Sequence, residues 1–264
     1  MLLPSQRRQR ILEDIYQSGS RMVSDLSEKY GVSEMTIRRD LRALEKEGYV
    51  KREHGGAVRR PASPAEPHII DWEKRHQLFP RQKASIARVA VHELIADGDV
   101  IILEGGTTVT AMSRHLAHKR DLTVVTNGLY TTDELHRRLS PSTTIISVGG
   151  ILRRESATWV GPLAERFFHE FHANKLFLSA TGLTLEAGIT DPNMLETQIK
   201  KAMVASASKV FMLMDSSKFG VKSLMTVLPL EKVSLLITDE GSPNEIIRGL
   251  ETRGIDVWIA PESQ

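Results

Sequence analysis

Residues 33–41 read SEMTIRRDL, and this stretch decides the fold of the first part of the chain. Ser33 is a good N-cap, because its hydroxyl can accept a hydrogen bond from a backbone N–H that the first helical turn leaves unpaired. The pattern therefore predicts a helix that starts at this serine. Ile37, Leu41 and Leu44 follow at i, i+4 and i+7, the spacing of a helix face that packs on a core.

The opposite face of this helix is basic, because each residue turns the helix by about 100°. Such a helix suits a helix-turn-helix, in which one side packs on a scaffold and the other enters the major groove of DNA. Arginine can bond the guanine edge there. We expect the DNA contacts of this helix from Ser33, Met35, Thr36, Arg38, Arg39 and Arg42.

The flanking segments complete a winged helix-turn-helix. Helical spacing predicts two scaffold helices, over residues 6–16 and 23–30. After Gly48, two short β-rich runs are joined by glycines that permit positive φ in a tight turn, which predicts a basic β-wing. A solvated basic helix with an ordinary hairpin is the plainer alternative, and we favour it less because all the parts occur together in order. The wing residues expected at DNA are Arg52, His54, Gly55 and Gly56.

Composition agrees with two folded parts of unlike charge. The chain has 264 residues, 41% of them hydrophobic, and a net charge of +2. Residues 1–60 carry 13 basic and 9 acidic side chains, whereas the remainder carries 22 basic and 24 acidic ones. The absence of cysteine excludes disulfides and thiol chemistry. No apolar run approaches the roughly 18 residues that span a bilayer, so we expect a cytoplasmic protein with no membrane partner.

The domain organisation follows from these segments. We expect a DNA-binding domain over residues 1–58, a linker over 59–80 and an effector and oligomerisation domain over 81–264. The run RRPASPAEPH (59–68) contains three prolines, which restrict helix and sheet. Ile69, Ile70 and Trp72 indicate that the second half of the linker docks on another part of the chain.

The region after the linker alternates between helical and β-rich patterns. Continuous apolar strands imply a sheet covered on both faces, so we predict an α/β fold with a mostly parallel sheet and helices on both faces. The expected strands cover residues 100–103, 122–125, 143–148, 176–179, 210–214, 234–238 and 257–260. The expected helices cover residues 83–95, 107–118, 129–139, 162–171, 195–206 and 243–253.

Small and polar residues follow four of these strands. Residues 104–108 read EGGTT, and the later strands end in TNG (126–128), GG (149–150) and ATGL (180–183). Backbone N–H groups and hydroxyls at such turns can surround a phosphate or carboxylate. Each one alone is more often an ordinary turn after a strand. Because all four should meet at one edge of the sheet, we favour a ligand site there.

The chain resembles the DeoR family of bacterial regulators. The resemblance rests on RxxxIL (7–12), SEMTIRRDL (33–41) and HGG (54–56), and continues through EGGTT, TNG, GLxxxxGIT (182–190) and DSSKFG (215–220). It implies a second domain similar in fold to ribose-5-phosphate isomerase. It also implies a repressor of carbohydrate-catabolism genes that a phosphorylated sugar or sugar acid relieves. Glu104 departs from the family, which more often has aspartate there.

The resemblance also assigns roles to residues of the second domain. The turn from Gly105 to Thr108 would hold the anionic group, Glu104 and Asn127 would bind sugar hydroxyls, and Lys218 would supply a positive charge. The expected effector-binding residues are Glu104, Gly105, Gly106, Thr107, Thr108, Thr126, Asn127, Gly149, Gly150, Gly182 and Lys218. A single recognition helix reads few base pairs, so we also expect a homo-oligomer, a dimer or tetramer, on double-stranded operator DNA.

Other functions find less support. A sugar-phosphate isomerase could use Glu196 as a base, but the strand end at residues 180–183 lacks the acidic residues of that enzyme. The pairs His115/His118 and His169/His172 lack a third metal ligand, so we expect no metal and no cofactor. A further alternative is an architectural DNA-binding protein whose second domain only oligomerises.

Overall fold

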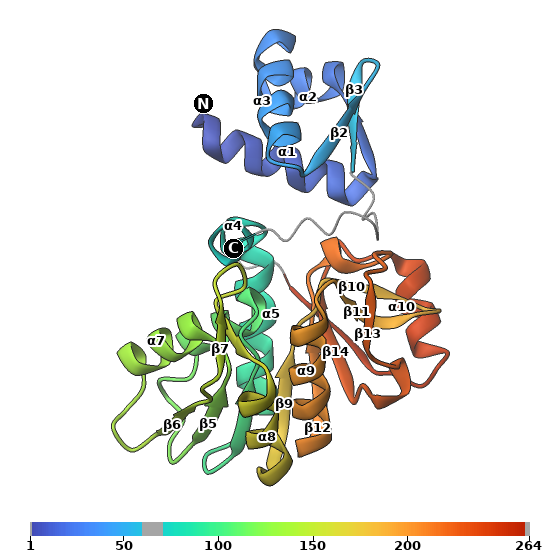
Figure 1. Cartoon of the computed structure of the whole chain (residues 1–264). Helices are drawn as coiled ribbons and strands as arrows, with labels where there is room; N and C mark the ends of the chain where they lie inside the picture. Colours follow the sequence, from blue (N-terminus) through green and yellow to red (C-terminus); the bar gives the residue numbers. More distant parts are fainter. Residues whose placement is uncertain (1, 60–70, 262–264) are drawn as a thin grey trace. The chain divides into compact units, whose positions relative to one another are not determined.

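The computed structural model describes residues 2–59 and 71–261 (Figure 1). The chain separates into two compact units, residues 1–62 and 63–264, which are described one at a time. Among the described residues, no helix is long and apolar enough to cross a membrane. Ile69 and Ile70, which we expected to dock, lie outside the described residues.

The first unit is a winged helix, with three helices and a three-stranded sheet in the order β1-β3-β2. Apolar residues from all three helices, among them Ile11, Leu26, Ile37 and Leu41, are fully buried and form its core. The strand β1 was not predicted. The helices are α1 (Pro4–Ser18), α2 (Val23–Tyr30) and α3 (Glu34–Lys46), and the strands are β1 (Ser20–Met22), β2 (Val50–Glu53) and β3 (Gly56–Arg59).

The second unit is built on a seven-stranded sheet in the order β15-β14-β12-β9-β4-β5-β6, in which every pair is parallel. Branched and aromatic apolar residues dominate these strands because both faces of the sheet are covered. This confirms the predicted α/β class. The strands are β4 (Val100–Leu103), β5 (Thr123–Thr126), β6 (Thr144–Ser147), β9 (Ala173–Leu178), β12 (Ala207–Leu213), β14 (Leu235–Asp239) and β15 (Val257–Ala260).

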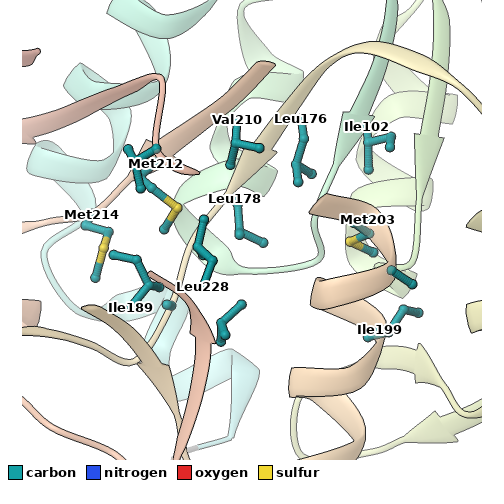
Figure 2. Close-up of a cluster of buried hydrophobic side chains, with 14 of the residues drawn as sticks. Ile102, Leu176, Leu178, Ile189, Ile199, Met203, Val210, Met212, Met214 and Leu228 are labelled. Carbon is teal, nitrogen blue, oxygen red and sulfur yellow. The ribbon is translucent and has the colours of Figure 1, made fainter. Parts of the chain in front are cut away.

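Each face of the sheet has its own apolar core. One core receives α5 (Pro80–Leu94), α6 (Thr107–Thr110), the 3-10 turn η1 (Ala111–Arg114) and α7 (Leu129–Arg138). The other receives α8 (Pro162–Glu170), α9 (Met194–Ser206) and α10 (Asn244–Glu251). Figure 2 shows this second core, where Ile199 and Met203 of α9 lie near Ile102 of β4 and Leu176 and Leu178 of β9.

The structure corrects the sequence prediction in two segments. The helix expected over residues 107–118 is only α6 followed by η1, which ends at Arg114. Residues 107–110 read TTVT, and β-branched side chains lose rotamer freedom in a helix, so this start is a weak one. In the segment expected to be a linker, Trp72–Gln77 forms the helix α4, which was not predicted, whereas the expected docking of Trp72 is confirmed because its side chain is buried.

Several short elements had no counterpart in the prediction. The hairpin β7 (Ile151–Arg153) with β8 (Thr158–Val160) follows β6. A separate small sheet contains β10 (Gly182–Thr184), β11 (Gly188–Asp191) and β13 (Met225–Leu228). The single-turn 3-10 segments η2 (Ser216–Lys218) and η3 (Leu230–Lys232) follow β12 and β13.

Candidate DNA-binding and effector sites

The helix α3 has the arrangement that a recognition helix needs. Ser33 is its N-cap, and its Oγ accepts a hydrogen bond from the backbone N–H of Thr36 at 3.3 Å. Ile37 and Leu41 are fully buried, whereas Met35 is 77% exposed. Arg39 and Arg42 are exposed on the same helix. The N-cap and the apolar stripe predicted from the sequence are thus both present.

Two of the predicted DNA contacts, Arg38 and Arg52, lie close to glutamates of the same unit. Arg38 is half-buried and pairs with Glu34 at 3.1 Å. In the wing, the side chain of Arg52 lies 3.7 Å from Glu45, which also accepts a hydrogen bond from the Arg52 backbone N–H. These glutamates would compete with DNA phosphates for the two arginines.

The tip of the wing divides between exposed and scaffold residues. His54 and Gly55 are exposed, and Gly55 has φ of 81°, which favours glycine. Gly56 is buried, and a Cβ there would lie 2.4 Å from the carbonyl oxygen of Arg21 in β1. Gly56 therefore allows β3 to pair closely with β1. This role could not be predicted from the sequence, because the strand β1 was not predicted.

A buried ion pair fixes the recognition helix on its scaffold. Arg7 of α1 donates from Nε to Asp40 of α3 at 2.7 Å, and both side chains are about 5% exposed. Asp40 is the acidic residue of the RRDL run, and it is buried whereas Glu34 of the same helix is exposed. The sequence reasoning missed this pair, although the spacing of Asp40 one residue before the buried Leu41 placed it near the core face.

In the second unit, the predicted effector residues lie where parallel strands end. The strands β4, β5 and β6 run to one side of the sheet, and the chain then returns to place β9 against the other side of β4. The join between β4 and β9 is thus a topological switch point, where ligands of open α/β sheets bind outside the carboxyl ends. Glu104 follows β4 and Ser179 follows β9 at this join.

The glycines of the EGGTT turn are explained by packing. A Cβ at Gly105 would lie 2.6 Å from the Thr158 side chain and 2.7 Å from the Gly128 Cα. A Cβ at Gly106 would lie 2.0 Å from the Ser179 hydroxyl. The turn is therefore closely surrounded by its own protein neighbours. Thr107 and Thr108, at the start of α6, are also buried.

Asn127 joins the ends of β4 and β5. Its Oδ1 accepts from the backbone N–H of Gly105 at 3.0 Å, and its Nδ2 donates to the Trp159 carbonyl at 3.2 Å. Thr126 is fully buried, and its Oγ1 accepts from the Gly128 N–H at 3.0 Å. Both residues are thus already bonded to backbone groups of the turns, and they shape the strand ends.

Glu104 belongs to a buried charge network that the sequence did not reveal. One carboxylate oxygen accepts from the Ser179 hydroxyl at 2.9 Å, and the other lies 3.4 Å from Nζ of Lys200. Lys200, from α9, also donates to Asp191 at 2.6 Å. All three charged side chains are at most 7% exposed. Burial opposes the charge of Lys200, but the carboxylates of Asp191, Glu104 and Glu196 raise its pKa above the usual value.

A second charged group follows β12. Asp215 is fully buried and is the N-cap of η2, which ends at Lys218. Burial opposes ionisation of Asp215, yet the charges of Lys218 and Lys83 hold its pKa below the usual value. Lys83, in α5, is buried too, and burial lowers its pKa to about 7. The sequence reasoning found Lys218 and missed Lys83.

The remaining predicted glycines lie further from the β4–β9 join. Gly149 and Gly150 follow β6, two strands from β4, hence roughly 10 Å away along the sheet. Gly149 is exposed with open space around its Cα, while Gly150 has φ of 132° beside the β8 carbonyl of Val160. Gly182 begins β10, where a Cβ would lie 2.2 Å from the Val221 carbonyl. Among the predicted effector glycines, Gly149 alone would leave open space for a side chain.

These features define a class of protein: a winged helix with an exposed basic recognition face, on the same chain as a parallel α/β unit with charged strand ends. The first unit matches the DeoR-like helix-turn-helix domain over residues 7–61, and the second matches the DeoR C-terminal sensor domain over residues 79–240. The chain belongs to the DeoR family of transcriptional regulators.

Relatives agree along the whole chain. An HTH-type transcriptional regulator of Bacillus subtilis (strain 168), YulB, is 36% identical over 100% of this chain and 99% of its own length. A putative aga operon transcriptional repressor of Escherichia coli O157:H7 is 35% identical over 98% of this chain and 94% of its own length.

Solved structures are more distant. A ribose 5-phosphate isomerase of Methanocaldococcus jannaschii has a TM-score of 0.36 at 18% identity, with 52% of this chain and 53% of that one covered. The fold class assigned above therefore rests on the strand order of this chain and not on that likeness.

Proposed function

We propose that this protein is a repressor that binds operator DNA as a homo-oligomer and is released by a phosphorylated sugar or sugar acid. The observation that carries DNA binding is α3, with Met35, Arg39 and Arg42 exposed opposite the buried Ile37 and Leu41. One such helix contacts few base pairs, so two or more copies are needed for tight binding. A relative named as an operon repressor supports repression.

The proposed effector site lies at the carboxyl ends of β4, β9 and β12. Two positive side chains, Lys83 and Lys218, lie near Asp215 there, and their charges lower the pKa of this carboxyl. Lys218 supplies a cation at this strand end, and a cation there favours an anionic ligand group. Thr107 and Thr108 supply hydroxyls at the turn after β4. These observations support a phosphorylated sugar as the effector.

A catalytic function is not part of this proposal. The isomerase alternative needs Glu196 as a base, but its carboxylate lies 3.1 Å from the Arg153 guanidinium. This ion pair engages the carboxylate that the isomerase reaction would need as its base. Among the described residues there is also no group of three or more His, Cys, Asp or Glu side chains placed to hold a metal ion.

Two measurements on the full chain test the proposal. Binding sites selected from a random DNA library should share a repeated half-site, and sedimentation should show an oligomer on each selected site. A panel of glucose 6-phosphate, fructose 1-phosphate, ribose 5-phosphate, glycerol 3-phosphate and galactosamine 6-phosphate is then screened by thermal shift. At least one compound should raise Tm and weaken DNA binding, because a ligand that binds only the folded state stabilises it. DNA binding with no response to any sugar phosphate would favour the architectural alternative.

A further inference from the structure

The helix α4 begins at Trp72, one residue after the second described range starts, and packs on the proposed effector site. Its first residue, Trp72, is 7% exposed, and its indole Nε1 donates to the Gly105 carbonyl at 3.0 Å. The backbone N–H of Trp72 donates to the Glu155 carbonyl at 2.7 Å. The side chain of the first α4 residue is thus bonded to the turn that follows β4.

Aromatic packing holds the indole in this position. The rings of Trp72 and His76 are stacked with centroids 4.8 Å apart, and the Tyr130 ring lies 4.3 Å away on α7. The Tyr130 hydroxyl also donates to Glu73 of α4 at 3.1 Å. Such contacts limit the rotation of the indole, so its N–H points at one acceptor.

A second anchor fastens the other end of α4. The ammonium of Lys83 donates to the carbonyls of Arg75 and Leu78, the latter at 2.6 Å. These carbonyls lie in the last turn of α4 and just beyond it. Lys83 is also one of the two lysines whose charges act on Asp215 in the proposed effector site. Both ends of this short helix are therefore attached to groups that surround the site.

We propose that Trp72 is a positioning residue of the effector site, which fixes the Gly105 turn and makes α4 respond to an effector bound there. This inference rests on the proposed function. An effector that bonds to the turn changes the position or polarity of the Gly105 carbonyl, which is the acceptor of the indole N–H. The helix α4 lies between that acceptor and residues 60–70 in sequence, so a displacement of Trp72 reaches the chain that leads to the first unit.

The first test needs no effector. Trp72→Phe keeps an aromatic ring and removes the N–H donor, so Gly105 loses one restraint. A buried hydrogen bond of about 1 kcal/mol corresponds to roughly fivefold in an opening equilibrium, so hydrogen exchange of the Gly105–Thr108 amides should accelerate about three- to tenfold. Tyr130→Phe is the matched control, because it releases Glu73 but leaves the indole bond intact. Equal exchange in W72F and wild type, or equal acceleration in both variants, would overturn the positioning role.

The second test measures coupling. For a compound of the sugar-phosphate panel that stabilises the wild type, the ratio of operator Kd with and without the compound is compared in wild type and W72F. We expect W72F to lose at least about threefold of this ratio, the effect of one hydrogen bond. A purely structural role would lower stability and leave the ratio intact, and that result would overturn the coupling.

A third measurement leaves Trp72 in place, so it decides even if W72F does not fold. The chain has three tryptophans, at positions 72, 159 and 258. In Trp159→Phe/Trp258→Phe, emission comes from Trp72 alone and should shift when the stabilising compound binds. Unchanged emission at saturation would overturn the coupling. If no panel compound stabilises the wild type, the proposed function fails and the coupling with it, and the exchange test still decides the positioning role.

Discussion

Removal of the Lys200 ammonium gives the sharpest test of the charge network at the β4–β9 join. In Lys200→Met, a side chain of similar length replaces the lysine, and the carboxylates of Glu104 and Asp191 lose their cation. Both carboxylates are at most 5% exposed, and Nζ of Lys200 lies 3.4 and 2.6 Å from them. Loss of one partner of a buried ion pair typically costs about 3–5 kcal/mol, because the remaining charge is buried without compensation.

Urea unfolding followed by tryptophan emission measures this loss in the right part of the chain. All three tryptophans lie within residues 63–264, so their emission reports the second unit without a contribution from the first. The matched control is Lys201→Met, which removes the exposed neighbour of Lys200 on the same helix. We expect a change within about 0.5 kcal/mol for this control.

A double-mutant cycle of Lys200→Met and Glu104→Gln separates the energy of the Lys200–Glu104 ion pair from the packing defect that Lys200→Met creates. Because Lys200→Met/Glu104→Gln has one fewer uncompensated carboxylate, it should be less destabilised than the sum of the two single variants. A loss below about 1 kcal/mol for Lys200→Met, equal to an ordinary hydrogen bond, would refute the view that this ammonium neutralises the strand ends.

Three further predictions follow from the sites. Arg39→Ala should cost about 1–3 kcal/mol at a selected operator and less on random DNA, as titration by fluorescence anisotropy would show; equal losses would make Arg39 a phosphate contact. Thr107→Val/Thr108→Val should keep the repressor on its operator at an effector concentration that releases the wild type. The control is Thr143→Val, which changes a buried threonine at the amino end of β6, away from the carboxyl ends of the strands, and this variant should release DNA normally. The pKa of Lys83, lowered from 10.5 to about 7, implies that the unfolded chain binds this proton more tightly. Stability should therefore rise with pH between those values, by up to about 1.4 kcal/mol per unit, and Lys83→Met should flatten that rise in urea titrations.

Much of the fold could be predicted because periodicity reports burial. The strand β4 and the helix α2 have the bounds that the sequence indicated, since their apolar patterns are strong and their ends carry turn residues. The hairpin β7–β8 and the sheet of β10, β11 and β13 were missed, because their short strands mix polar residues or glycine with apolar ones, unlike the continuous apolar run of β4. The helix α4 was missed because prolines dominate the segment that precedes it.

The strand ends proposed as the effector site could be located from the sequence, whereas their side-chain interactions could not. Polar residues after parallel strands had to meet at one edge, whatever their long-range partners. The pairing of Glu104 with Lys200, 96 positions later, depends on how α9 packs across that edge, and no local pattern encodes it. The same limit applies to Lys83, which sits in a helix whose apolar spacing gave no sign of a buried charge.

The strand order has a consequence for how the chain assembles during synthesis. Residues 100–147 contain β4, β5 and β6, which are neighbours in the sheet, and they leave the ribosome before any strand of the other half. The second half, from β9 onward, must then pair with the exposed edge of β4, a contact between residues more than 70 positions apart. Such non-local parallel pairing forms slowly. The β4–β9 seam should therefore be the last part of the sheet to close, and until then the β4 edge is open to misassociation.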